Sequence, residues 1–154
     1  GNCPMEETVM SLLVMHGIDV GIKYNSLYGL SKLVGEIAGT PANRPFVGDM
    51  TYTTEIGVGA SAYRRVTKEN PPFPAMVYPV VPEFVGHKPQ DIVMGKKSGV
   101  DNVEIWAERL GIELTREEAR EIVGHVKNKG IELRRLLTED EFREVVQHVK
   151  ANKA

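Results

Sequence analysis

Histidine is the side chain best suited to metal binding or proton transfer near neutral pH, and the chain has four. They lie far apart in the sequence, at His16, His87, His125 and His148. None has a second histidine or a carboxylate at a metal-ligand spacing, and no Cys/His zinc pattern is present. A glycine-rich phosphate loop and the Gly-x-Ser-x-Gly turn of hydrolases are also missing. These motifs therefore point to no self-contained active site.

The other reactive side chains have structural explanations. Cys3 is the only cysteine, so it forms no internal disulfide, which fits a reducing cytosol. It precedes a predicted helix, where a thiol can be reactive, but a small packing residue is the simpler interpretation. The acidic pairs Glu6–Glu7 and Glu117–Glu118 fall in predicted first turns, where the helix dipole favours negative charge.

Composition is typical of a globular chain with one core. It has 154 residues, 42% hydrophobic and 26% charged, with a net charge of -2. Since there is no basic excess, we expect neither nucleic acid nor an anionic membrane as a partner. No apolar run approaches the roughly 20 residues of a spanning helix, so we expect a soluble protein. We expect its location to be cytoplasmic. The chain opens with Gly1, and both a piece of a larger protein and a natural split subunit stay open.

Helical patterns dominate the first 66 residues. A helix is predicted over Pro4–Gly17 and a second over Ser26–Gly39. Their apolar sides imply burial against a larger body, and they are formed by Met5, Val9, Leu12 and Leu13 and by Leu27, Leu30, Leu33, Val34 and Ile37. A weaker helix is predicted from Thr54 to about Val66. Gly57 and Gly59 each disfavour it by roughly 1 kcal/mol relative to alanine, so close backbone contact must support it.

The rest of the chain divides into a proline-rich middle and a charged helical tail. Six prolines fall between Pro71 and Pro89, followed by one strand candidate over Ile92–Met94. Three amphipathic helices are predicted in the tail, and their apolar stripes are Val103, Trp106, Ala107 and Leu110; Ala119, Ile122, Val123 and Val126; and Phe142, Val145, Val146 and Val149. The spacings Thr115-x-x-Glu118 and Thr138-x-x-Glu141 predict capping boxes. A small packed bundle is the interpretation that we favour.

Five segments in order resemble the isopropylmalate, citramalate and homocitrate synthase family. They are GNCPMEETVMSL at 1–12, LSKLV followed by Gly-Thr-Pro within 30–41, FVGD at 46–49, PEFVG at 82–86 and IVMGKKSG at 92–99. The first segment is also similar to one in hydroxymethylglutaryl-CoA lyases. The resemblance covers essentially the whole chain. No single segment is decisive, but together they are fairly specific.

The resemblance implies a mostly α fold with at most one or two short strands. Residues 1–45 would form the last helix or helices of a TIM-type catalytic barrel and a first linker helix. Residues 46–98 would form a first small helical subdomain with the Pro-rich irregular connection. Residues 99–154 would form a second helical subdomain.

By the same resemblance, the complete protein would condense an acyl-CoA thioester with a 2-oxo acid on a divalent cation, Zn, Mn or Mg. Most of that machinery would lie in a barrel outside this chain, which alone should be inactive and hold no cofactor. Asn2 alone matches a metal ligand of the family. Its amide oxygen suits a hard cation, and its alternative role is to cap the first helix.

Two positions depart from the family pattern. Where the family has Glu-Ser-Gly-Ile-His, this chain has glycine at Gly59 in place of the histidine, and Lys97 replaces the histidine of Gly-Lys-His-Ser-Gly. Glu55 matches the glutamate of the first motif. Glu55, Tyr78 and His87 are therefore weak catalytic candidates, and Tyr52 and Tyr63 lie nearby in the sequence.

The resemblance also implies a homodimer in which the subdomains cover the partner's barrel. Two alternatives remain. One is a lyase or aldolase of the same superfamily, and the other is a non-catalytic interaction subunit that completes a separate barrel. The sequence names neither the 2-oxo acid, the thioester nor the metal, because the residues that select them would lie outside this chain.

Overall fold

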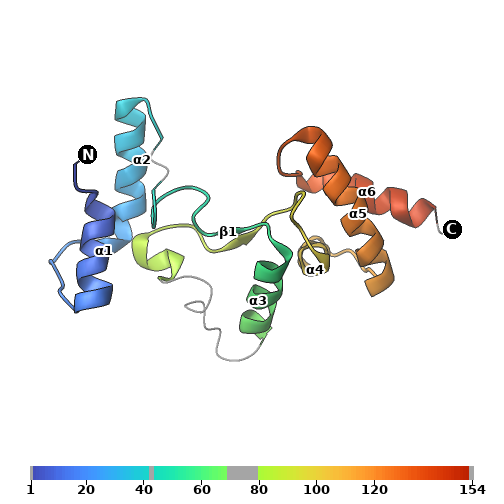
Figure 1. The fold of residues 1–154 in the computed structure, drawn as a ribbon, viewed down its shortest axis with the longest axis horizontal. Coiled ribbons are helices and arrows are strands. Elements are labelled where there is room, and N and C mark those ends of the chain that lie inside the picture. The colour runs from blue at the N-terminus through green and yellow to red at the C-terminus, as the bar shows by residue number, and fades with distance from the viewer. Residues whose placement is uncertain (1, 42–43, 69–79, 153–154) are drawn as a thin grey trace. The chain divides into compact units, whose positions relative to one another are not determined.

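A computed structural model of the chain describes residues 2–41, 44–68 and 80–152. These residues contain six α-helices and two short strands, which confirms the mostly α fold class (Figure 1). The chain divides into an N-terminal unit, residues 1–52 with 78–90, and a C-terminal unit, residues 53–77 with 91–154. The division at residues 45 and 98 expected from the sequence stays a prediction.

The N-terminal unit contains α1 (Met5–His16), the short 3-10 helix η1 (Tyr24–Ser26) and α2 (Leu27–Ala38). Both α-helices end where the sequence predicts, on Gly17 and Gly39 in left-handed conformations that glycine adopts without strain.

The core of the N-terminal unit differs in part from the predicted apolar sides. In α1, Met10 is fully buried, whereas Met5 is exposed. In α2, Leu27 is buried, but the rest of the predicted apolar side remains accessible. The other 3-10 helix, η3 (Pro82–Val85), packs on η1, and the core consists of Met10, Leu27, Val47, Tyr52, Val80 and Val85.

The C-terminal unit begins with a parallel pair of strands, β1 (Thr53–Thr54) and β2 (Asp91–Ile92). Because β1 uses Thr53 and Thr54, the third helix begins later than predicted, as α3 (Gly57–Lys68). The predicted strand Ile92–Met94 is shifted for the same reason, since pairing begins at Asp91. Pairing between these two distant segments therefore sets where α3 begins and where β2 begins.

The three tail helices are α4 (Val100–Leu110), α5 (Arg116–Leu133) and α6 (Glu139–Ala151), as the periodicity predicts. Both predicted capping boxes are present, at the starts of α5 and α6. Trp106 is 6% exposed, and its indole N–H donates to the carbonyl of Ile92 at 2.5 Å. Its ring meets Phe142 edge to face, with 5.4 Å between centroids. This contact ties the helices to β2.

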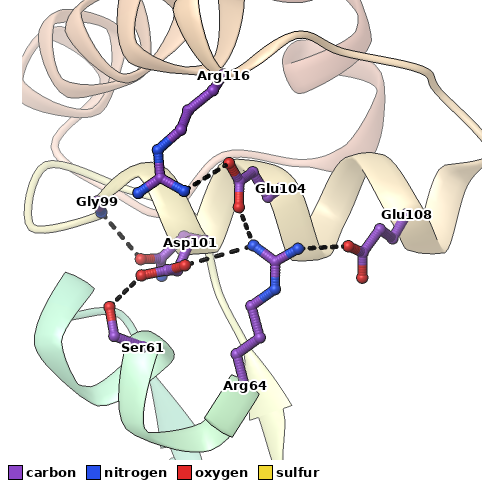
Figure 2. A network of polar contacts seen from close by, with 8 residues as sticks. Ser61, Arg64, Gly99, Asp101, Glu104, Glu108 and Arg116 are labelled. Carbon is purple, nitrogen blue, oxygen red and sulfur yellow. Dashed lines mark hydrogen bonds and ion pairs between the residues drawn. The ribbon is translucent and has the colours of Figure 1, made fainter. Parts of the chain in front are cut away.

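A polar network joins α3 to α4 (Figure 2). The Arg64 guanidinium contacts the carboxylates of Asp101, Glu104 and Glu108, the last at 2.6 Å. The Ser61 hydroxyl donates to Asp101 beside it. Since the Arg64 side chain is only 21% exposed, these contacts replace lost hydration and fix the packing of the two helices.

None of the helices in the described residues is both long enough and apolar enough to cross a membrane.

Candidate functional site

Two of the family-like segments lie against each other in the C-terminal unit. Gly57 and Gly99 contact through their backbones: a Cβ atom on Gly57 would lie 2.9 Å from the Cα of Gly99. The Gly57 N–H donates to the carbonyl of Lys97 at 3.2 Å. Only glycine allows this approach, so the close backbone contact predicted for Gly57 is confirmed.

Glu55, a catalytic candidate, holds the same loop in place. Its Oε1 atom accepts a hydrogen bond from the Lys97 N–H at 3.0 Å. A Cβ atom on Gly95 would lie 2.5 Å from this oxygen, so glycine leaves the room that the carboxylate occupies. The structure therefore gives Glu55 a positioning role within this chain, and its catalytic role stays a prediction.

Asn102 completes this contact, although no sequence motif points to it. It is fully buried, and its amide nitrogen donates to the carbonyls of Glu55 at 2.9 Å and Val93 at 3.2 Å. Its amide oxygen accepts from the Gly99 N–H at 2.9 Å. One signal could have found it, because an asparagine three residues after a helix-starting glycine can bond back to that glycine.

Gly59, where the family has histidine, is enclosed by its neighbours. A Cβ atom there would lie 2.6 Å from Cγ2 of Thr54 and 3.2 Å from Cγ2 of Ile56. Any larger side chain would require the Thr54 and Ile56 side chains to shift. The side chains of Thr54 and Ile56 therefore occupy the space beside Gly59, and Gly59→His would not restore the family pattern without moving them.

His87 lies in the N-terminal unit and is 7% exposed. Its two ring nitrogens lie 3.1 Å from the carbonyl oxygens of Gly48 and Lys88. The ring packs between Tyr28 and Tyr52, with centroid distances of 4.1 and 4.8 Å. Both nitrogens face backbone oxygens, so His87 packs this unit, while its use in catalysis stays a prediction.

An ion pair lies beside this aromatic group. Asp49 accepts hydrogen bonds from the Lys32 ammonium at 2.5 Å and from the Tyr28 hydroxyl at 3.0 Å. The bond from Lys32, followed by that from Tyr28, lowers the pKa of the Asp49 carboxyl. Partial burial and the bond to Asp49 raise the pKa of Tyr28. Asp49 therefore stays ionised and ties its loop to α2.

The predicted metal ligand, Asn2, is exposed just before α1. The N-cap of α1 is Pro4, so the alternative role of Asn2 as the helix cap is wrong. Within residues 2–41, 44–68 and 80–152, no three His, Cys, Asp or Glu side chains are grouped to hold a metal ion. The exposed Asn2 oxygen fits a cation as a single donor, and the remaining ligands would have to come from outside these residues.

Tyr78, the remaining catalytic candidate, lies outside the described residues.

The four histidines are not all isolated from one another in the fold. His125 on α5 and His148 on α6 meet with their ring centroids 5.4 Å apart. The sequence could not show this contact, since it depends on how the two helices pack.

Comparison with known proteins identifies relatives that are named as synthases. No family model matches the chain. The chain is 38% identical over 132 residues to a putative (R)-citramalate synthase of Archaeoglobus fulgidus, which covers 84% of this chain and 25% of that protein. It is 36% identical over 129 residues to a homocitrate synthase of Methanothermobacter thermautotrophicus, covering 82% of this chain and 31% of the relative.

A third relative, a probable 2-isopropylmalate synthase of Methanopyrus kandleri, is 35% identical over 133 residues, with 84% of this chain and 25% of the relative covered. The chain thus spans about a quarter of the length of the curated relatives that it matches. All three names are those of synthases, and the match runs along most of the chain. The chain therefore belongs to the family of citramalate, homocitrate and isopropylmalate synthases, as part of its C-terminal region.

Proposed function

We propose that the complete protein is a synthase of amino-acid biosynthesis that transfers the acyl group of an acyl-CoA to a 2-oxo acid. The observation that carries this proposal is the 35% to 38% identity to three differently named synthases over more than four fifths of the chain. The relatives differ in their named products, so the particular 2-oxo acid stays open. A cytoplasmic location goes with this proposal.

Within that protein, this chain contributes dimerisation and cover for the active site. The outer side of α2 supports this role, because four large apolar side chains are between 42% and 79% exposed there: Leu30, Leu33, Val34 and Ile37. Exposed apolar area of this kind favours association with a further surface. The catalytic barrel and a second copy of the chain are the two surfaces that we expect it to contact.

The chain supplies little of the chemistry itself. A bound divalent cation would polarise the keto oxygen of the 2-oxo acid, and Asn2 would offer it one amide oxygen. Glu55 and Asn102 hold the Gly95–Gly99 loop in shape, as their hydrogen bonds to its backbone indicate. With Gly59 in place of the family histidine, this position offers no side chain that could accept the proton next to the thioester.

The test is thiol release by the complete protein. Acyl-CoA and a panel of 2-oxo acids are supplied with Zn, Mn or Mg, and free coenzyme A is followed with a thiol reagent. We expect release that depends on one 2-oxo acid, and none from residues 1–154 alone. Carbon–carbon cleavage of the hydroxy acids without net condensation would instead identify a lyase, and no reaction in either direction would support a non-catalytic subunit.

The assembly is tested separately, by light scattering on the complete protein. A dimer is expected. Replacement of Leu33 and Ile37 by serine should then produce monomers without loss of helix content, since both side chains are exposed in the single chain. A complete protein that is monomeric at all concentrations would contradict the dimerisation role.

A further inference from the structure

An open pocket of about 470 Å³ lies where the end of α5 meets the loop between β2 and α4. Three basic residues line it, namely Lys96 from the loop and Arg134 and Arg135 from the turn after α5. The only acidic residue in its lining is Glu55. Basic residues therefore outnumber acidic residues in the lining of this pocket.

The cations differ in how they are held. Arg135 makes two bonds to the Glu141 carboxylate, at 2.9 and 2.5 Å, so its charge is already matched. Within the part of the chain that the structure describes, no carboxylate lies within ion-pair distance of Lys96 or Arg134. Glu55 is occupied on one oxygen by the Lys97 N–H. The lining thus contains two cations without a carboxylate partner among the described residues and one partly engaged carboxylate.

Arg134 stands at a position where stability alone favours glycine. Its φ of 55° lies in the left-handed region, which strains an L residue. The corresponding residues after α1, α2 and α4 are all glycine, at Gly17, Gly39 and Gly111. Arg134 therefore combines a left-handed backbone with a place in the pocket lining, and backbone strain of this kind clusters at functional sites.

The packing below the pocket keeps the two cations near each other. A Cβ atom on Gly130 would lie 2.9 Å from the backbone nitrogen of Lys96, so α5 rests directly on the loop. Arg134 follows one turn later, and its N–H donates to the Gly130 carbonyl at 3.1 Å. Lys96 and Arg134 are therefore carried by two segments in backbone contact, which limits how far they can separate.

We propose that this pocket binds a small anion whose charge lies on carboxylate or phosphate oxygens, held mainly by Lys96 and Arg134. Guanidinium and ammonium groups bind such oxygens through charge-assisted hydrogen bonds. Arg135, fixed by Glu141, adds charge at the rim. This site rests on residues of this chain alone, and its test does not depend on synthase activity.

To test the proposal, the 154-residue chain is titrated at low ionic strength with two probes, inorganic phosphate and malonate. Binding is measured by calorimetry and by amide NMR shifts. Arg134→Gln and Lys96→Gln should each weaken binding of the better probe about tenfold or more. Glu55→Gln should tighten it, because this change removes the negative charge of the lining. The matched control is Arg143→Gln, an exposed site on α6 outside the pocket, which should change affinity by less than about twofold.

A second variant separates binding from folding. Arg134→Gly removes the charge but relieves the strained conformation, so it should raise the thermal midpoint and still lose binding. Tighter binding of phosphate would assign the pocket to phosphate groups, and tighter binding of malonate to carboxylates. Equal effects of Arg134→Gln and Arg143→Gln, or no saturable binding of either probe, would overturn the proposal.

Discussion

Two glycines of α5, Gly124 and Gly130, should respond in different ways to the same substitution by alanine. Alanine is favoured over glycine within a helix by up to about 1 kcal/mol at either position. A Cβ atom at Gly124 meets nothing within 4 Å, so Gly124→Ala should stabilise the C-terminal unit by about 0.5–1 kcal/mol. At Gly130 the new atom would meet the backbone of Lys96 and Gly95 at 2.9 and 3.2 Å.

Backbone cannot move aside as a flexible side chain does, so Gly130→Ala carries an overpacking cost of about 1–3 kcal/mol. The helix-propensity gain is common to both variants and cancels in their difference. The free energy of unfolding of Gly130→Ala should therefore lie about 1–3 kcal/mol below that of Gly124→Ala. The comparison isolates the contact between α5 and the Gly95–Lys96 loop.

Urea unfolding followed by the fluorescence of Trp106 measures this difference, because Trp106 is the only tryptophan and lies in the core of the C-terminal unit. With an m value of about 2 kcal/mol per M, the two midpoints should differ by about 0.5–1.5 M. If both variants shift the midpoint by the same amount, the backbone contact at Gly130 does not exist as described.

Three more predictions concern single side chains. Trp106→Ala should destabilise the C-terminal unit by about 3–5 kcal/mol in urea unfolding followed by circular dichroism, and a loss of a few tenths would exclude a core role. The hydrogen bond from Arg135, followed by that from the Thr138 backbone, lowers the pKa of Glu141 to about 2 from 4.5. Glu141 should therefore stabilise the fold fully above pH 4.5 and lose that contribution as the pH falls toward 2, so the stability difference between wild type and Glu141→Gln should vanish over that range. A constant difference would contradict this linkage. In the complete enzyme, Asn2→Ala should weaken metal binding with little effect on folding, and unchanged affinity by calorimetry would remove Asn2 from the ligands.

Local sequence signals predicted the helices well where the signals are themselves local. The ends of α1 and α2 on Gly17 and Gly39 follow from the conformational freedom of glycine. The starts of α5 and α6 follow from threonine and glutamate spaced to bond each other's backbone. Each of these features involves residues within one helical turn, so the sequence contains all the partners.

Features that need a distant partner were harder to predict. The helical pattern predicts that α3 starts at Thr54, because nothing in the sequence connects the two segments that pair as β1 and β2. In α1, burial of Met10 depends on what packs against the helix, which periodicity leaves undetermined.

The candidate site shows the same limit. The sequence pattern singles out Glu55 and the glycines beside it, yet Asn102, whose hydrogen bonds connect three segments, carries no motif of its own. Its role depends on the carbonyls of Glu55 and Val93, and folding alone brings these groups together.

The pairing of β1 with β2 also constrains the order in which the chain can fold during synthesis. Thr53–Thr54 leave the ribosome long before Asp91–Ile92, so the nascent β1 has no partner while the intervening segment is made. The segment around β2 also bonds to residues that are synthesised later. The Ile92 carbonyl accepts from the Trp106 indole N–H, and the Met94 carbonyl accepts from the Leu137 N–H at 2.9 Å. The native surroundings of β2 are therefore complete only after residue 137 has been synthesised, and a nascent chain stalled before residue 91 would leave β1 without its partner strand.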